Sequence, residues 1–327
     1  MTPLSSNFDN ADQQTDLQNA LTLCAFSELT NPGTLDSTLS GWSIVWDGGL
    51  TIDGNYAFIA TDLGKSTYVL TIAGSLMTTG TFTKDWDFFA NWVLEDFNVL
   101  TKKNWPYATT ANPCISDGAY IAFQNLQLMQ DSKGSNLHIA EYLINAINNG
   151  KRVIITGHSL GGLMANVFAS YFISTLTSSD GVSLYTFAAP AAGNGDFATD
   201  LDAKLQNAWH YQCSNDIIPN FPVAADVKKV ASMFTPQPLA ANIPVTRQGN
   251  PMMLDKAILL LHDVLLLCGY KQQARNYTIL TTDLNDLPNN EGNTLKNWLT
   301  QAGSQHIIEN YAAHLAPKQT KQATQFA

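Results

Sequence analysis

The sequence is short of charge. Only 13% of its 327 residues are charged, while 45% are hydrophobic. A disordered chain would contain fewer apolar and more charged residues, so this composition excludes a largely unfolded protein. The few charges are mostly acidic, with a net charge of −10, and lysine and arginine form no cluster. Nucleic-acid binding needs a basic surface and is therefore not expected.

The chain also lacks a long hydrophobic run. Its longest apolar stretch, residues 257–270, contains His262 and Asp263 and is too short to cross a bilayer, so we interpret it as a buried or groove-facing helix. The N-terminus is polar and acidic and has none of the basic and apolar segments of a secretory signal. We expect a cytoplasmic protein, a leaderless export route or a leader already removed, and the sequence leaves these three open.

Cysteine is scarce, and its positions are scattered. The four cysteines form no CxxC pair, so a zinc site is not expected: Cys24, Cys114, Cys213 and Cys268. Four cysteines allow three disulfide pairings, between which the sequence does not choose. Because no leader is visible, we favour reduced cysteines in the core.

Short apolar strands alternate with amphipathic helices along most of the chain. The patterns predict strands at 55–62, 66–74, 153–156, 182–190 and within 207–219, and helices at 12–26, 119–130, 137–148, 160–176 and 294–315. Such alternation is typical of a mainly parallel sheet with crossover helices. Without internal repeats or linkers, we expect one domain over residues 1–327, with a helical insertion at about 223–275.

Three glycines surround a single serine directly after a buried strand. The pentapeptide GHSLG, residues 157–161, fits G-x-S-x-G between the strand VIIT and a helix. A sharp strand-to-helix turn holds such a serine in a sparsely populated backbone conformation. We expect Gly157 and Gly161 to permit this turn and Gly162 to ease the packing of the helix. Ser159 would then lie at the carboxyl end of the sheet, where α/β folds bind ligands.

Several segments resemble the motifs of one enzyme family. VIITGHSLGGLMA, SLYTFAAPAAGN, SNDIIPNFP and GSQHIIENYAAHL are similar to four segments of the class 3 (fungal-type) triacylglycerol lipases. These are the serine elbow, the following strand, an Asp-x-Val-Pro segment and a terminal His-x4-Tyr segment. The resemblance runs from about residue 54 to 315 and is weakest at 223–275. It implies an α/β-hydrolase fold with a mainly parallel central sheet, helices on both faces and a lid over the carboxyl end.

A serine nucleophile needs a base to take its proton and a carboxylate to orient that base, in the chain order Ser, Asp, His. By the resemblance, Ser159 matches the nucleophile, Asp216 the acid and His306 the base. Asp216 also suits a loop beyond a strand, whereas its rivals lie in a polar stretch: Asp196, Asp200 and Asp202. Among the other histidines, we interpret three as packing or structural: His210, His262 and His158. The alternative base is His314.

The oxyanion hole of a serine hydrolase consists of N–H groups that meet the developing negative charge. One donor is the residue after the nucleophile, Leu160. The resemblance implies a second donor at Ser75, in the loop after the strand at 66–74. The family usually has Phe-Arg-Gly-Ser or Phe-Arg-Gly-Thr in this loop, and here Ala73 replaces the arginine.

Seven aromatic residues lie within 86–107, in the region that the resemblance assigns to a lid at about 76–113. Four of them are our candidates for lid or substrate contacts: Trp86, Phe89, Trp92 and Phe97. An amphipathic aromatic helix could cover the site in water and open on an oil surface. Its spacing fits ordinary core packing as well. Together with the apolar helix at 257–268, this segment favours an acyl-binding groove and uncharged, lipid-like esters.

The leading hypothesis is a serine ester hydrolase of the lipase type, which cleaves acylglycerol esters through an acyl-enzyme on Ser159. It would need no metal or organic cofactor. Its expected partners are a lipid or ester substrate and the lipid–water interface, and the sequence does not indicate an oligomeric state. The alternatives are a carboxylesterase for short-chain or aryl esters, a phospholipase A1, and a non-catalytic protein that binds lipid surfaces.

Overall fold

A computed structural model describes residues 10–29, 39–51, 54–74, 98–235, 237–240, 252–284 and 295–316. Within these residues, one sheet has the strand order β1-β2-β3-β6-β7-β8-β11. Its strands are β1 Trp42–Asp47, β2 Ala57–Asp62, β3 Thr67–Ile72, β6 Arg152–His158, β7 Val182–Phe187, β8 Ala208–Cys213 and β11 Tyr277–Leu280. The first three strands pair antiparallel, and all pairs from β3 to β11 are parallel. The sheet is therefore mixed and mainly parallel.

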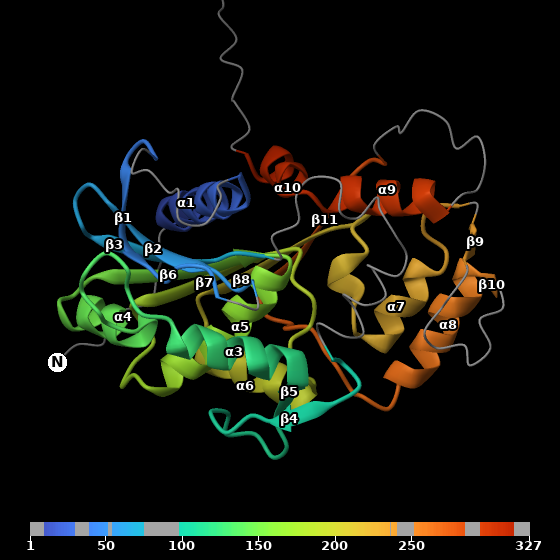
Figure 1. Ribbon diagram of the computed structural model, residues 1–327, viewed down its shortest axis with the longest axis horizontal. Helices are drawn as coiled ribbons and strands as arrows, with labels where there is room; N and C mark the ends of the chain where they lie inside the picture. The colour runs from blue at the N-terminus through green and yellow to red at the C-terminus, as the bar shows by residue number, and fades with distance from the viewer. Residues whose placement is uncertain are drawn as a thin grey trace, which may run out of the picture.

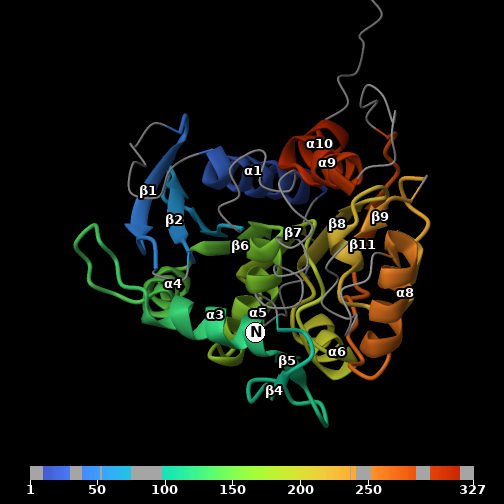
Figure 2. The same cartoon turned by 45° about the vertical axis from the view of Figure 1, so that its right-hand side comes forward.

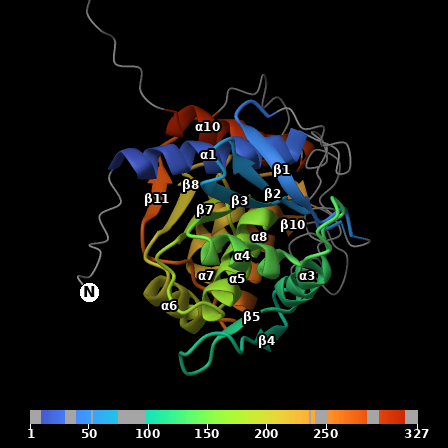
Figure 3. The ribbon, with the colours of Figure 1, turned by 90° about the vertical axis from the view of Figure 1, so that its left-hand side faces the viewer.

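Helices cover both faces of this sheet (Figure 1; Figure 3). One face carries α1 (Asn10–Leu29) and α10 (Ile308–Leu315), and the other carries α3 (Asp117–Leu128), α4 (Ile139–Asn148), α5 (Leu160–Ser174) and α6 (Gly195–Lys204). Because side chains alternate along a strand, β6 supplies both cores. Ile154 packs in the cluster under α1, whereas Val153 and Ile155 pack in the cluster under α5. The predicted fold class is confirmed.

The remaining elements lie to the right of the sheet, at the top of the molecule next to α10, and below the sheet (Figure 2). They are β4 Lys102–Asn104, β5 Cys114–Ser116, the 3₁₀ turn η3 Ile218–Asn220, α7 Ala224–Val230, β9 Leu239–Ala240, β10 Met252–Met253, α8 Leu254–Leu265 and α9 Leu295–His306. Residues 223–275, where we expect an insertion, contain α7, α8 and a small β9–β10 ladder. Helix α8 packs against α7, which follows β8 and η3, so the insertion lies next to the loops that end the parallel strands.

Among the strands of the main sheet and the helices on its two faces, three elements are absent from the sequence-based expectations: β1, α6 and β11. Strand β1 is only partly buried, and β11 is a four-residue edge strand with exposed positions. Helix α6, GDFATDLDAK, is polar along most of its length. All three lack the strong apolar periodicity on which sequence patterns depend, because each buries only part of its surface.

Candidate active site

The turn between β6 and α5 holds Ser159 in a strained conformation. Its φ is +57° and its ψ −128°, a combination that non-glycine residues rarely adopt. A Cβ atom on Gly157 would lie 2.2 Å from the carbonyl oxygen of Gly161, and one on Gly161 would lie 2.1 Å from that of Ile72. A Cβ on Gly162 would lie 2.8 Å from the Cβ of Ala189. The glycines therefore allow backbone to pass directly behind the serine.

Three side chains from distant parts of the chain meet at the carboxyl end of the sheet. Ser159 Oγ lies 2.8 Å from Nε2 of His306, and Nδ1 of the same ring lies 2.8 Å from Oδ2 of Asp216. Ser159 follows β6, Asp216 lies in the loop beyond β8, and His306 ends α9. All three are buried. With its Nδ1–H donated to the carboxylate, His306 presents an unprotonated Nε2 to the serine hydroxyl, as proton abstraction requires.

The Asp216 carboxylate is held from several sides. Its Oδ1 accepts the N–H of Ile218 at 2.9 Å, and its Oδ2 accepts the hydroxyl of Tyr311 at 2.7 Å. The Tyr311 hydroxyl in turn accepts the N–H of Cys213 at 3.1 Å. Burial, and then the neighbouring Asp216 charge, raise the pKa of Tyr311 well above its usual value, so it stays a donor. Sequence analysis recorded this tyrosine in the His-x4-Tyr motif but assigned it no contact.

The rival carboxylates have other partners. Three of them lie on α6 and form hydrogen bonds to neighbouring loops: Asp196, Asp200 and Asp202. Asp196 accepts the N–H of Asn112, and Asp202 accepts the N–H of Ala274. Asp200 accepts the N–H of Thr109 and forms an ion pair with Lys204. None of these contacts involves the serine or the histidine of the proposed triad.

The rival histidines also lie apart from the serine hydroxyl. His210, in β8, contacts the Thr186 hydroxyl at 2.7 Å, and burial lowers its pKa to about 3. His262 pairs with Asp263 on α8, and His314 contacts the carbonyl of Asn310 on α10. His158 contacts Glu28 of α1 through Nδ1 and the backbone oxygen of His306 through Nε2.

The proposed oxyanion donors are described only in part. Leu160 is the first residue of α5, where backbone N–H groups are not used within the helix. Gly74 lies close to the elbow, since a Cβ there would be 3.0 Å from the carbonyl oxygen of His158. Ser75 and the four lid candidates lie outside the described residues: Trp86, Phe89, Trp92 and Phe97. Ala73, where the family has arginine, is buried and donates its N–H to the carbonyl of Tyr56 at 3.0 Å.

The end of the aromatic segment belongs to the core. Trp105 is fully buried and donates its indole N–H to Ser170 on α5 at 2.9 Å. Its ring lies 4.9 Å from those of Tyr107 and Phe123, in edge-on arrangements. These contacts attach the strand β4 and its following loop to the face of the sheet covered by α5.

The four cysteines are free thiols, and three of them are buried. Burial raises the pKa of Cys213 to about 12, so it is not a nucleophile at neutral pH. In the part of the chain that the structure describes, no group of three His, Cys, Asp or Glu side chains is placed to hold a metal ion. Among the same residues, no helix combines the length and apolar character needed to cross a bilayer.

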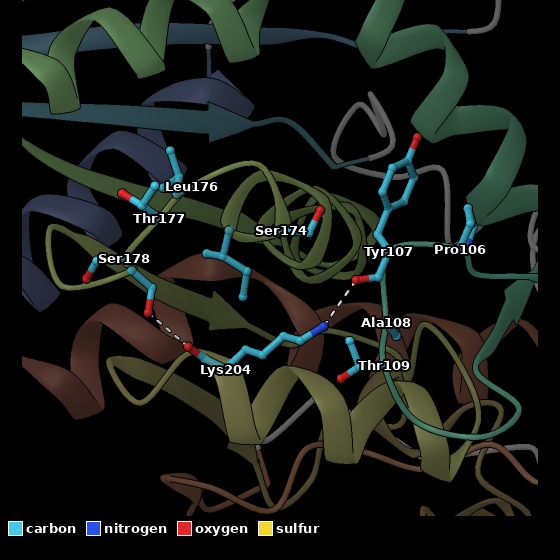
Figure 4. Close-up of a pocket in the computed structure, with 11 residues that line it drawn as sticks. Pro106, Tyr107, Ala108, Thr109, Ser174, Leu176, Thr177, Ser178 and Lys204 are labelled. Atoms are coloured by element: carbon cyan, nitrogen blue, oxygen red, sulfur yellow. Dashed lines mark hydrogen bonds between the residues drawn. The ribbon is translucent and has the colours of Figure 1, made fainter.

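A pocket of about 680 Å³ opens at the other end of α5 (Figure 4). Its lining includes Tyr107, Thr109 and Ser174, and Lys204 crosses it to the carbonyl of Tyr107 at 3.2 Å. Helix α5 rises by about 1.5 Å per residue, so Ser174 and Ser159 are separated by roughly 20 Å. This pocket is therefore not part of the serine site.

Comparisons with known proteins agree with this fold. Residues 89–225 match the family model of lipase (class 3). A secreted mono- and diacylglycerol lipase of Fusarium solani is 26% identical over 174 residues, which are 53% of this chain and 44% of that protein. The chain thus spans less than half the length of this curated relative.

Solved structures show the same fold over a larger part of the chain. The M37 lipase has a TM-score of 0.68 at 21% identity, and the match covers 94% of this chain and 92% of that one. A triacylglyceride lipase of Rhizomucor miehei has a TM-score of 0.50 at 20% identity, covering 66% of this chain and 77% of that one. At these identities the likeness concerns the fold alone. The resemblance seen in the sequence is confirmed.

Proposed function

Residues 89–225 match the model of the class 3 lipase family, and from this premise we propose that the chain is a serine ester hydrolase acting on acylglycerols. One observation carries the proposal, namely the continuous chain of contacts from Ser159 through His306 to Asp216, with both distances at 2.8 Å. A nucleophile, its base and the orienting carboxylate in hydrogen-bonding reach are what acyl transfer needs.

The reaction proceeds through an acyl-enzyme. Ser159 Oγ attacks the ester carbonyl while Nε2 of His306 takes the hydroxyl proton. The resulting imidazolium stays paired with Asp216 and then gives its proton to the leaving alcohol. Water then attacks the acyl carbon while His306 takes one of its protons; the acyl–Oγ bond breaks, the acid leaves, and His306 returns the proton to Ser159 Oγ.

The developing oxyanion has donors on the elbow itself. Leu160 N–H is at the start of α5, where the helix dipole adds positive potential, and Ser75 is the proposed second donor. The fixed elbow holds this geometry before substrate arrives, since its φ and close glycine contacts leave little freedom. Preorganised donors of this kind are typically worth about 3 kcal/mol each in the transition state.

An exposed apolar stripe on α8 supports a lipid substrate. Leu260 and Val264 are exposed one turn apart on α8, and exposed Met253 and Leu267 lie just before and just after the helix. The stripe lies near the loops that end the parallel strands, since Gly269 accepts the N–H of Gly195 beyond β7. A contiguous apolar face beside an ester-hydrolysing centre suits contact with a lipid surface.

The charge of the insertion also supports a lipid substrate. Residues 223–275 carry six Lys or Arg and three Asp or Glu, in a chain whose overall charge is −10. Lys228 and Lys229 on α7 and Lys256 on α8 are exposed. A net positive charge in this segment favours approach to a lipid surface with anionic groups.

Hydrolysis of esters of increasing acyl length, with and without emulsification, tests the proposed function. We expect activity on emulsified long-chain acylglycerols, and we expect Ser159→Ala to abolish it while the fold is kept. Labelling with a fluorophosphonate should occur on Ser159 in the folded protein. Activity confined to short soluble esters would favour the carboxylesterase alternative, and a folded protein that is not labelled would contradict a serine hydrolase.

The α8 stripe has its own test. In the variant Val264→Ser/Leu267→Ser, hydrolysis of emulsified substrate should fall at least about tenfold, because each side chain forfeits on the order of 1 kcal/mol of apolar burial. Hydrolysis of a short soluble ester should be unchanged. The matched control is Leu63→Ser, which removes a leucine that is 78% exposed on the loop between β2 and β3, at the opposite end of the sheet.

A further inference from the structure

The last turn of α1 carries an acidic residue next to the elbow. Helix α1 is fixed on the sheet by an ion pair between Asp16 and Arg152 and by a 3.1 Å contact between Cys24 Sγ and Thr156 Oγ1. Glu28 lies in its final turn, which holds no basic residue. A carboxylate at the C-terminal end of a helix is disfavoured by the helix dipole, so its position there calls for a nearby cation.

His158 supplies that cation. Its Nδ1 forms an ion pair with the Glu28 carboxylate, and its Nε2 lies 2.8 Å from the backbone oxygen of His306. Both partners can only accept a hydrogen. A neutral imidazole has one N–H and would serve one of them, whereas an imidazolium serves both. The surroundings of the ring therefore select the protonated form.

The electrostatics agree with this assignment. Burial works against a charged His158, but the Glu28 carboxylate, with a smaller contribution from Asp216, raises the pKa of His158. Partial burial works against a charged Glu28, although 29% of its side chain is accessible, and the His158 charge outweighs this and lowers the pKa of Glu28. The two groups stabilise each other as an ion pair beside the serine.

The groups that face His158 come from several elements. They are Glu28 from α1, Asp216 from the loop after β8, His306 from α9 and Tyr311 from α10. The rings of His158 and His306 are 4.7 Å apart and inclined by 34°. Tyr311 remains neutral because its pKa is raised, and so does the Cys24 thiol near Glu28. The charges that act on the ring are thus two carboxylates and the second imidazole.

We propose that Glu28 and His158 form a second charge pair that positions His306 in the ester hydrolase proposed above. The imidazolium of His158 holds the backbone carbonyl of His306 through its Nε2–H, and Glu28 keeps that imidazolium protonated. Glu28 also offsets the positive charge of His158 when His306 becomes a second imidazolium during the reaction. During the reaction, Glu28, His158, His306 and Asp216 then carry the charges minus, plus, plus and minus, so that a carboxylate lies on the outer side of each ring. Glu28 and His158 are positioning residues, since they act through His306.

This arrangement makes the rate depend on the protonation of His158. When pH rises through its raised pKa, His158 loses one N–H, and either the His306 carbonyl or Glu28 loses its donor. The pair is therefore complete at lower pH and is lost on the alkaline side. Replacing Glu28 by a neutral residue removes the main cause of the raised pKa, so the loss should begin at lower pH.

Steady-state kinetics of Glu28→Gln on a short soluble ester tests the role in catalysis. We expect kcat to fall about tenfold with KM nearly unchanged, and the alkaline limb of the kcat–pH profile to move down by about one pH unit. The matched control, Glu309→Gln, makes the same change at an exposed position in the first turn of α10 and should alter neither quantity. An unchanged pH profile in folded Glu28→Gln would overturn the proposal.

A second measurement does not depend on activity. Nitrogen-15 NMR of histidine-labelled protein should show both ring nitrogens of His158 protonated at pH 7 in the wild type, with the signal assigned by its absence in His158→Gln. In Glu28→Gln the same ring should become neutral at that pH. A neutral His158 in the wild type would refute the charge pair. If Ser159 is not labelled by a fluorophosphonate, the ester hydrolase fails, whereas the NMR result still decides whether the pair exists.

Discussion

Tyr311→Phe removes one hydroxyl that makes two buried hydrogen bonds and leaves no cavity. The hydroxyl donates to Asp216 at 2.7 Å and accepts the N–H of Cys213 at 3.1 Å, and Tyr311 is fully buried. A hydrogen bond to a charged group contributes about 1.5–3 kcal/mol, and a buried N–H left without a partner costs about 1–3 kcal/mol. We expect the free energy of unfolding to fall by about 3 kcal/mol.

The activity should change much less than the stability. Asp216 keeps the Ile218 N–H on Oδ1 and His306 on Oδ2. The carboxylate is then less firmly held but still paired with the imidazole, so kcat on a soluble ester should fall by no more than about tenfold, or roughly 1.4 kcal/mol.

Urea denaturation at neutral pH, combined with kinetics below the unfolding transition, measures both effects. The matched control is Tyr270→Phe, which removes a buried tyrosine hydroxyl that donates to the carbonyl of Val99 at 2.9 Å. It should cost about 1 kcal/mol and leave kcat unchanged. If Tyr311→Phe is destabilised no more than Tyr270→Phe, the Asp216–Tyr311–Cys213 network does not contribute as reasoned here.

Three further predictions concern the triad, the elbow and pH. Asp216→Asn should lower kcat by on the order of 10⁴ at neutral pH, by removing the charge that pairs with the imidazolium, while Asp202→Asn on α6 keeps full activity. Gly157→Ala should destabilise the fold by about 3 kcal/mol or more, since its Cβ would lie 2.2 Å from a backbone oxygen, whereas Gly195→Ala, with no neighbour nearer than 3.7 Å, should fold normally, as thermal unfolding would show. Burial lowers the pKa of His210 from 6.5, its value in an unfolded chain, to about 3 in the folded protein. Between pH 3 and pH 6.5, the ring is therefore protonated only in the unfolded chain. Stability should therefore fall by up to about 1.4 kcal/mol per unit as pH drops below 6.5, and urea titrations of His210→Gln should show a shallower fall.

Local patterns were sufficient for the elbow and for most of the buried elements. Strand VIIT, the GHSLG turn and the apolar helix after it carry their signals within a few residues, and they agree with β6, the elbow and α5. Strand β11 and helix α6 escaped prediction, because an edge strand and a polar surface helix bury too little to impose a clear period on the sequence. The proposed triad needed the resemblance as well, since composition and spacing left several aspartates and histidines open.

The sequence by itself determined the fold class, the serine elbow and the resemblance to class 3 lipases, because these depend on short-range spacing and on glycines that no other residue can replace. Only the tertiary structure decided which charged groups meet. Asp216 and His306 are 90 residues apart, and Glu28 reaches His158 only because α1 packs across β3, β6 and β7. Such contacts are set by the parallel register of the sheet and by the way helices cover it, and no local pattern records them. The Glu28–His158 pair therefore appears in the structure and could not be predicted from the sequence.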